Sequence, residues 1–160
     1  MTGLGIGALL LAGCQNVDNP APDYQPLVAR FYLETRVGEA GVPAQLPVSG
    51  VSITVSAKPV IVEYDIYNAE VAHVDLGSCL LLQLTPAAAR DLYRMSATNL
   101  GRRLVLFLND APMGARRIEQ AMPDGTLLVF VETPDAELAP LVARLKRTSA
   151  EIITAAAKKK

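Results

Sequence analysis

The fold of this 160-residue chain is decided by residues 84–134, which read LTPAAARDLYRMSATNLGRRLVLFLNDAPMGARRIEQAMPDGTLLVFVETP. Thr85 and Pro86 predict the start of a helix, because a threonine hydroxyl caps the first turn and proline has no N–H to leave unpaired. Gly101 is typical of the left-handed residue that follows a helix end. Residues 104–108 form a short, continuous apolar run, which is typical of a central strand.

Two turn signals separate the segments that follow. Residues 109–112 (NDAP) and residues 123–125 (PDG) carry turn-forming residue types, and the glycine of the second accepts a positive φ. Between the second turn and the next helix, residues 127–132 predict another apolar strand. A second Thr-Pro pair, residues 133–134, predicts the last helix, in which Pro140 predicts a kink or a restart. The apolar side chains of this helix recur at helical spacing: Leu138, Leu141, Val142 and Leu145.

The upstream half of the chain predicts several strands. Residues 51–56 alternate apolar and polar types and predict a half-buried strand. Residues 27–37 predict a first strand, and residues 38–50, rich in Gly and Pro, predict a loop. Residues 60–74 and 79–84 predict a hairpin. This order of strands and helices has too few crossovers for a parallel sheet. It favours an α+β fold, an antiparallel sheet with two helices packed on one face.

Composition excludes several classes of protein. Hydrophobic residues make up 51% of the chain and charged residues 19%, which excludes an intrinsically disordered protein. The net charge is −1, so no overall positive field attracts DNA or RNA. Aromatic residues make up 5% and Trp is absent, which argues against a platform that stacks bases. We therefore expect no nucleic-acid partner.

The N-terminal residues predict where the protein resides. Residues 4–11 form an apolar run that is shorter than the roughly 20 residues of a membrane span but typical of a signal peptide. Residues 11–14, LAGC, resemble the lipobox of bacterial lipoproteins. The resemblance implies a protein of the bacterial cell envelope that faces the periplasm and is held to the membrane by lipid on Cys14. No Lys or Arg lies between Met1 and Cys14, and the alternative interpretation is an apolar arm with a buried cysteine.

These signals divide the chain into four segments. We predict a lipoprotein signal peptide at residues 1–13, a tether at 14–26, an α+β domain at 27–149 and a flexible basic tail at 150–160. If the first cysteine carries lipid, Cys79 has no partner for a disulfide within the chain. We expect Cys79 to be a buried, inert thiol.

The central stretch is similar to a known family. Residues 84–86, 99–104 and 108–112 resemble the head subdomain of the first periplasmic domain of SecD, which shows a Leu-Thr helix start, an Asn-x-Gly-Lys-x-Leu step and a turn followed by proline. Residues 65–75 resemble a strand of the same subdomain. The similarity covers about residues 50–147, and Asn-Asp replaces the usual Asp-Gly in the turn.

This resemblance implies a ferredoxin-like sandwich on the outer side of the inner membrane. It also implies a partner in the export machinery or in an exported polypeptide, because SecD is an accessory of protein export. SecD carries a transmembrane bundle that this sequence does not show. The resemblance therefore favours a stand-alone relative of the head subdomain.

Residues that could carry out catalysis are sparse. His73 is the only histidine, and a triad can be drawn with Asp75 and Ser78, since residues 73 and 75 share one face of a strand. No nucleophile elbow or oxyanion-hole loop accompanies them, so we expect a surface histidine and no enzyme. One His and two distant Cys cannot supply a closed zinc site, and we predict neither a metal nor a cofactor.

A short segment of the central stretch is the candidate for partner binding. Ala111, Pro112, Met113 and Gly114 predict a bent, exposed sheet edge, and such an edge can accept an extended peptide by strand addition. Methionine would provide an adaptable apolar contact. The alternative interpretation is a bulge or bend that the sheet itself requires.

Three dibasic pairs could form a positively charged patch if the fold brings them together. They are residues 102–103, 116–117 and 146–147. The alternative interpretation is that they are solvated charges at the ends of helices and strands.

Together these observations predict a lipid-anchored envelope protein that binds protein and is not an enzyme, and the SecD resemblance implies a link to protein export. Two alternatives stay open. The first is a structural envelope lipoprotein without a client, and the second is a small hydrolase that uses His73.

Overall fold

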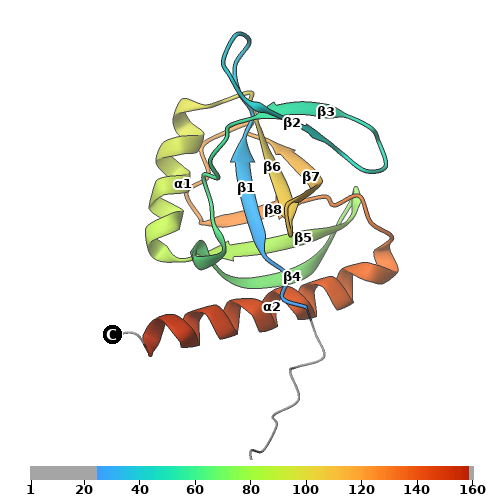
Figure 1. Ribbon diagram of the computed structural model, residues 1–160, viewed down its shortest axis with the longest axis vertical. Coiled ribbons are helices and arrows are strands. Elements are labelled where there is room, and N and C mark those ends of the chain that lie inside the picture. The colour runs from blue at the N-terminus through green and yellow to red at the C-terminus, as the bar shows by residue number, and fades with distance from the viewer. Residues whose placement is uncertain (1–24, 159–160) are drawn as a thin grey trace, which may run out of the picture.

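The computed structural model of the protein describes residues 25–158, and Figure 1 shows how its helices and strands are arranged. The helices and strands are β1 (Ala29–Leu33), β2 (Val42–Gln45), β3 (Ser52–Val55), the 3-10 helix η1 (Glu63–Asp65), β4 (Ile66–Val74), β5 (Gly77–Leu84), α1 (Pro86–Thr98), β6 (Arg103–Leu108), β7 (Ala111–Arg117), β8 (Thr126–Val129) and α2 (Asp135–Ala157). All strand pairs are antiparallel. The predicted α+β class is confirmed.

The strands are distributed over three sheets, where the sequence predicted one. Their orders are β1-β6-β7, β2-β3 and β4-β5-β8. Register shifts interrupt the pairing within β4–β5 and β6–β7, and such bulges bend strands and increase their twist. Single bridges join the sheets: Glu34 pairs with Val55, and Gly114 pairs with Val131 just after β8. The strands therefore curve around the core as short connected sheets.

Both helices bury their apolar side chains in one main core. α2 lies along the β4–β5 hairpin, and α1 covers an adjacent side (Figure 1). Of the predicted apolar stripe of α2, Leu138, Val142 and Leu145 are buried, and Leu141 packs against the core while partly exposed. The largest fully buried side chains of the main core are Phe31, Leu80, Leu82, Leu92, Leu104, Leu106, Ile118, Leu127 and Leu138.

A second, smaller core lies beneath the β2–β3 hairpin. This minor core contains Ala44, Leu46, Ile53, Val55 and Val105, with Tyr32, Phe107 and Ala115 packed against it. The rings of Tyr32 and Phe107 pack with centroids 4.6 Å apart. The hairpin thus covers the face of β1-β6-β7 that points away from the main core (Figure 1). Coverage of both faces explains why β6 is a continuous apolar run.

The predicted limits of α1 are confirmed. The Thr85 hydroxyl accepts a hydrogen bond from the Ala88 N–H at 3.4 Å, and Gly101 adopts φ of +83°. The β6–β7 turn is also defined: Asn109 and Asp110 both have positive φ, 46° and 66°. A two-residue type I′ turn requires such values, and Asn and Asp tolerate them better than most residues.

The structure differs from the sequence prediction in two segments. Residues 38–50, predicted as a loop, contain β2, which forms because it pairs with β3. Residues 150–157, predicted within a flexible tail, continue α2 as far as Ala157. Their sequence is rich in alanine, a strong helix former, and Arg147 pairs with Glu151 one turn later at 3.3 Å. α2 also continues through Pro140 without a restart.

Candidate functional site

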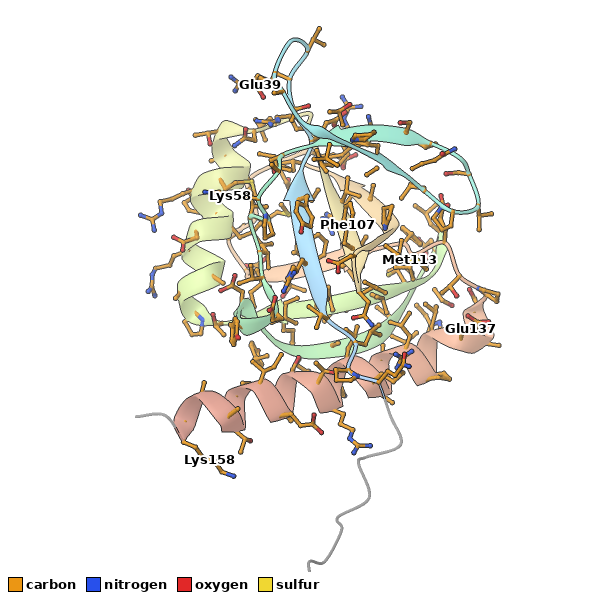
Figure 2. The ribbon with its side chains drawn as sticks, in the orientation of Figure 1. Glu39, Lys58, Phe107, Met113, Glu137 and Lys158 are labelled. Carbon is orange, nitrogen blue, oxygen red and sulfur yellow. The ribbon has the colours of Figure 1, made fainter. Side chains whose placement is uncertain are left out.

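A groove lies between the β6–β7 turn and the first half of α2. Its volume is about 540 Å³, and it includes two residues of the predicted edge, Ala111 and Met113. Figure 2 shows Met113 and Glu137 on the same side of the molecule, and both line the groove. The remaining lining residues are Leu27, Leu108, Asn109, Thr133, Pro140, Leu141 and Arg144.

Polar side chains fix the rim of this groove. Thr133 donates a hydrogen bond to Glu137 at 2.8 Å at the start of α2. Arg144, two turns further along α2, donates to the backbone carbonyl of Gln25 at 3.1 Å. The side-chain oxygen of Asn109 accepts a hydrogen bond from the Val28 N–H at 2.8 Å. The amide nitrogen of the same side chain donates to the Pro26 carbonyl at 3.0 Å. The rim therefore joins the β6–β7 turn and α2 to the chain that enters the domain.

The predicted edge contains a bulge and is closed at one end. The pairing register of β6 with β7 shifts between Leu106 and Phe107. Met113 is the additional residue of β7 at this bulge and has no partner in the β6 register. Its carbonyl accepts the Glu132 N–H at 2.7 Å, and Gly114 bridges Val131. We call these two contacts the seam, since they join the sheets β1-β6-β7 and β4-β5-β8. Strand addition is therefore blocked at Gly114, whereas the side chain of Met113 lines the groove.

Glu132 also holds the tip of the β2–β3 hairpin. One of its carboxylate oxygens accepts the backbone N–H groups of Val48 and Ser49 at 2.7 and 2.9 Å. Partial burial acts to raise the pKa of Glu132, but hydrogen bonds from Ser49 and from the Val48 N–H outweigh it and lower the pKa below 4.5. No sequence motif indicates this contact, because Glu132 and the hairpin tip lie more than 80 residues apart in the chain.

His73 is not arranged as a catalytic base. Its Nδ1 lies 3.2 Å from the Ser78 hydroxyl, and this hydroxyl donates to the Asp135 carboxylate at 2.8 Å. The acid is Asp135 of α2 and not the predicted Asp75. In a catalytic triad the imidazole lies between the hydroxyl and the carboxylate, whereas here the hydroxyl lies between the other two groups. The serine proton is directed to the carboxylate, so His73 cannot take it in this arrangement.

The fold brings two of the three dibasic pairs together. Arg103 and Arg117 are opposite each other in the β6–β7 register. Arg103 is occupied by an ion pair with Glu34, and its two hydrogen bonds to that carboxylate measure 3.0 and 2.5 Å. This pairing lowers the pKa of Glu34. Arg116 donates to the Leu128 carbonyl at 2.9 Å. The third pair, residues 146–147, lies on the exposed side of α2.

Cys79 is buried, with no exposed surface. Burial raises the pKa of its thiol, and the nearby charge of Arg116 offsets only part of this effect. Across residues 25–158, no three His, Cys, Asp or Glu side chains gather in a way that could hold a metal ion.

The predicted anchor lies outside the described residues. Cys14, the signal peptide at 1–13 and residues 14–24 of the tether all precede Gln25, where the description begins. In the part of the chain that the structure covers, neither helix is both long enough and apolar enough to cross a bilayer.

Comparisons of sequence with family models and with curated proteins find no match. Solved structures of SecDF are similar in fold. One is described as "a membrane component SecDF that enhances protein export". Its superposition covers 76% of this chain and 63% of the SecDF chain, with a TM-score of 0.59 at 17% sequence identity. SecDF in its super-membrane-facing form matches 74% of this chain with a TM-score of 0.60 at 17% identity. SecDF from Thermus thermophilus, a translocon-associated membrane protein, matches 78% with a TM-score of 0.51 at 18% identity.

The chain spans less than two thirds of each of these structures, and only 18% and 19% of the last two. At such low identity, the likeness bears on the fold alone. The SecD-like fold that residues 50–147 predicted is confirmed: the body of this protein has the architecture of part of SecDF.

Proposed function

We propose that this protein is a lipid-anchored, protein-binding module of the bacterial envelope that serves protein export. The observation that carries the proposal is the SecDF-like fold, because a solved structure of that fold is described as a membrane component that enhances protein export. Lipid on Cys14, predicted from residues 11–14, would hold the domain at the membrane where export takes place.

The groove beside β7 is the surface that fits a protein segment. Leu27, Met113 and Leu141 supply apolar side chains along it. An extended segment with alternate apolar residues could occupy them, since a groove at a bent strand can take side chains from a peptide backbone that runs past it. Methionine accommodates varied apolar side chains because it has no branched carbon. This suits a partner of variable sequence, such as an exported polypeptide.

Photo-cross-linking in cells tests this assignment. A photoreactive amino acid replaces Met113 in the groove, and in a matched control it replaces Val37, which is fully exposed in the loop between β1 and β2. We expect Met113 to cross-link to an exported chain or to a subunit of the export machinery, identified by mass spectrometry, and Val37 not to do so. A structural lipoprotein without a client would give the same products, or none, at both positions.

Two further variants separate the remaining alternatives. Cys14→Ala should leave an unprocessed protein without the added mass of the lipid, and an unchanged mature mass would contradict the anchor. His73→Ala should leave the Met113 cross-links unchanged, because His73 does not line the groove. If His73→Ala abolishes the function of the protein in cells while the Met113 cross-links remain, the result would instead support the hydrolase.

A further inference from the structure

A cluster of basic residues lies near the middle of α2, at residues 144–147, and Lys158 follows the helix end. Between residues 144 and 158 the exposed basic residues are Arg144, Lys146, Arg147 and Lys158, and Arg147 pairs with the one acidic residue of that segment, Glu151, at 3.3 Å. The acidic residues Asp135 and Glu137 lie in the first turn, at the other end. The helix therefore presents an asymmetric distribution of charge.

Small and apolar residues lie between these charges. Ala139, Ala143 and Ala150 are exposed on the outer side of α2. Near the helix end, Ile153 is 48% exposed, and the last buried residue, Thr148, precedes it by more than a turn. The apolar stripe of α2 is buried in the main core, so the basic residues are the groups that this side of the helix offers to an anionic membrane surface.

The chain enters the domain at this same helix. Gln25 is the first described residue, and Arg144 holds its carbonyl at 3.1 Å. The β2–β3 hairpin lies at the opposite end of the molecule from α2 (Figure 1). Any group attached upstream of Gln25 is therefore connected to the α2 end.

The point at which the chain enters the domain favours the orientation in which α2 faces the membrane. Eleven residue steps separate Cys14 from Gln25 and reach at most about 40 Å when fully extended. The described body has a radius of gyration of about 14 Å for its size, hence roughly 36 Å across. Turning the hairpin end to the membrane would require the connection to extend along the whole body.

We infer that the outer side of α2 rests on the anionic phospholipid headgroups of the membrane that holds the lipid on Cys14. This inference rests on the proposed anchor. The basic residues attract the headgroups, and each cation near an anionic surface is worth about fivefold in binding. The alanines allow the helix backbone to come close to the surface. In this orientation the groove, lined by Met113 and Leu141, stays open to the periplasm, and Arg144 lies between the groove and the membrane-facing side of α2.

Fluorescence quenching on vesicles tests the orientation with the full, lipidated protein. A single thiol is introduced at Ala143 on the outer side of α2, or at Val37 at the opposite end as a control. Cys79 is fully buried and does not compete for the label. The labelled protein is reconstituted in phosphatidylcholine vesicles with or without phosphatidylglycerol, with a nitroxide quencher on a lipid headgroup.

In phosphatidylglycerol vesicles we expect at least threefold stronger quenching at Ala143 than at Val37. In the combined variant Lys146→Gln and Lys158→Gln, the preference for the α2-down orientation should fall by about 25-fold, at fivefold per cation removed. Raising salt to 1 M on the unsubstituted protein should weaken the preference in the same direction, because the Debye length falls to about 3 Å.

Equal quenching at both positions, with the protein still bound to the vesicles, would overturn this inference and leave the anchor intact. A preference that neither salt nor neutral lipid weakens would overturn it too. Failure of the anchor gives a different result, since the protein is then absent from floated vesicles.

Discussion

Replacing Gly114 by alanine should open the seam between the two three-stranded sheets. A Cβ at this position would lie 2.2 Å from the Phe130 carbonyl oxygen and 3.2 Å from the Val131 Cα. Both neighbours are backbone atoms and cannot rotate away, so the segment after β8 must shift by about 1 Å to restore an ordinary contact. That shift disrupts the Gly114–Val131 bridge and the 2.7 Å hydrogen bond from Glu132 to Met113.

The magnitude follows from these two effects. Forcing an extra carbon into a tightly packed site costs about 1–3 kcal/mol, and a lost backbone hydrogen bond costs about 1 kcal/mol more. Alanine offsets roughly 0.5 kcal/mol by restricting the unfolded chain. The free energy of unfolding should therefore fall by about 1.5–3.5 kcal/mol, a large part of the roughly 5–15 kcal/mol of an ordinary domain.

Urea unfolding of the full chain, followed by circular dichroism, measures this loss. The control is Gly38→Ala, where φ is +87° and no atom lies within 4 Å of the added carbon. That variant has only the cost of a left-handed backbone, about 1 kcal/mol. If Gly114→Ala destabilises the protein no more than Gly38→Ala does, the seam is not a close contact and the reasoning is wrong.

Three further predictions concern charges and the buried thiol. Glu132→Gln should lower the free energy of unfolding by about 1 kcal/mol and speed amide hydrogen exchange at Val48 and Ser49. In the unsubstituted protein, the protection of these two amides from exchange should persist above pH 4.5. It should be lost as pH falls through the lowered pKa of Glu132. A double-mutant cycle between Arg30 and Glu63, which form hydrogen bonds of 2.7 and 2.9 Å, should give a coupling of about 1 kcal/mol at pH 7. This coupling should disappear below the lowered pKa of Glu63, and a coupling that persists at pH 2 would contradict the ion pair. Cys79 should react with a thiol reagent at pH 8 only after denaturation, since its thiol is buried and its pKa is raised, and rapid labelling of the folded protein would show that the strand opens.

The features that the sequence predicted well depend on neighbours along the chain. Thr85 and Gly101 limit α1 through hydrogen bonding and backbone freedom that act within one turn. The central position of β6 follows from its unbroken apolar run, because a strand covered on both faces carries no polar side. The apolar stripe of α2 follows from helical spacing alone.

Contacts between distant segments could not be predicted in this way. β2 lies within residues 38–50, which are rich in Gly and Pro, and is a strand because β3 pairs with it. Glu132 binds backbone N–H groups, which have no side-chain signature in the sequence. The groove also has this origin: the sequence indicated Ala111 and Met113, but the opposite wall comes from α2 and Leu27, which only the tertiary fold brings near.

The minor core gives the molecule two levels of stability. Its apolar contacts are separate from those of the main core, and Val105 is the one fully buried residue that β6 contributes to it. Detachment of the β2–β3 hairpin would expose this small cluster and leave the helices and the β4-β5-β8 sheet packed. Such local unfolding therefore requires less free energy than complete unfolding. A protease that nicks the hairpin tip near Val48, which is exposed, should therefore yield two fragments that stay associated around an intact main core.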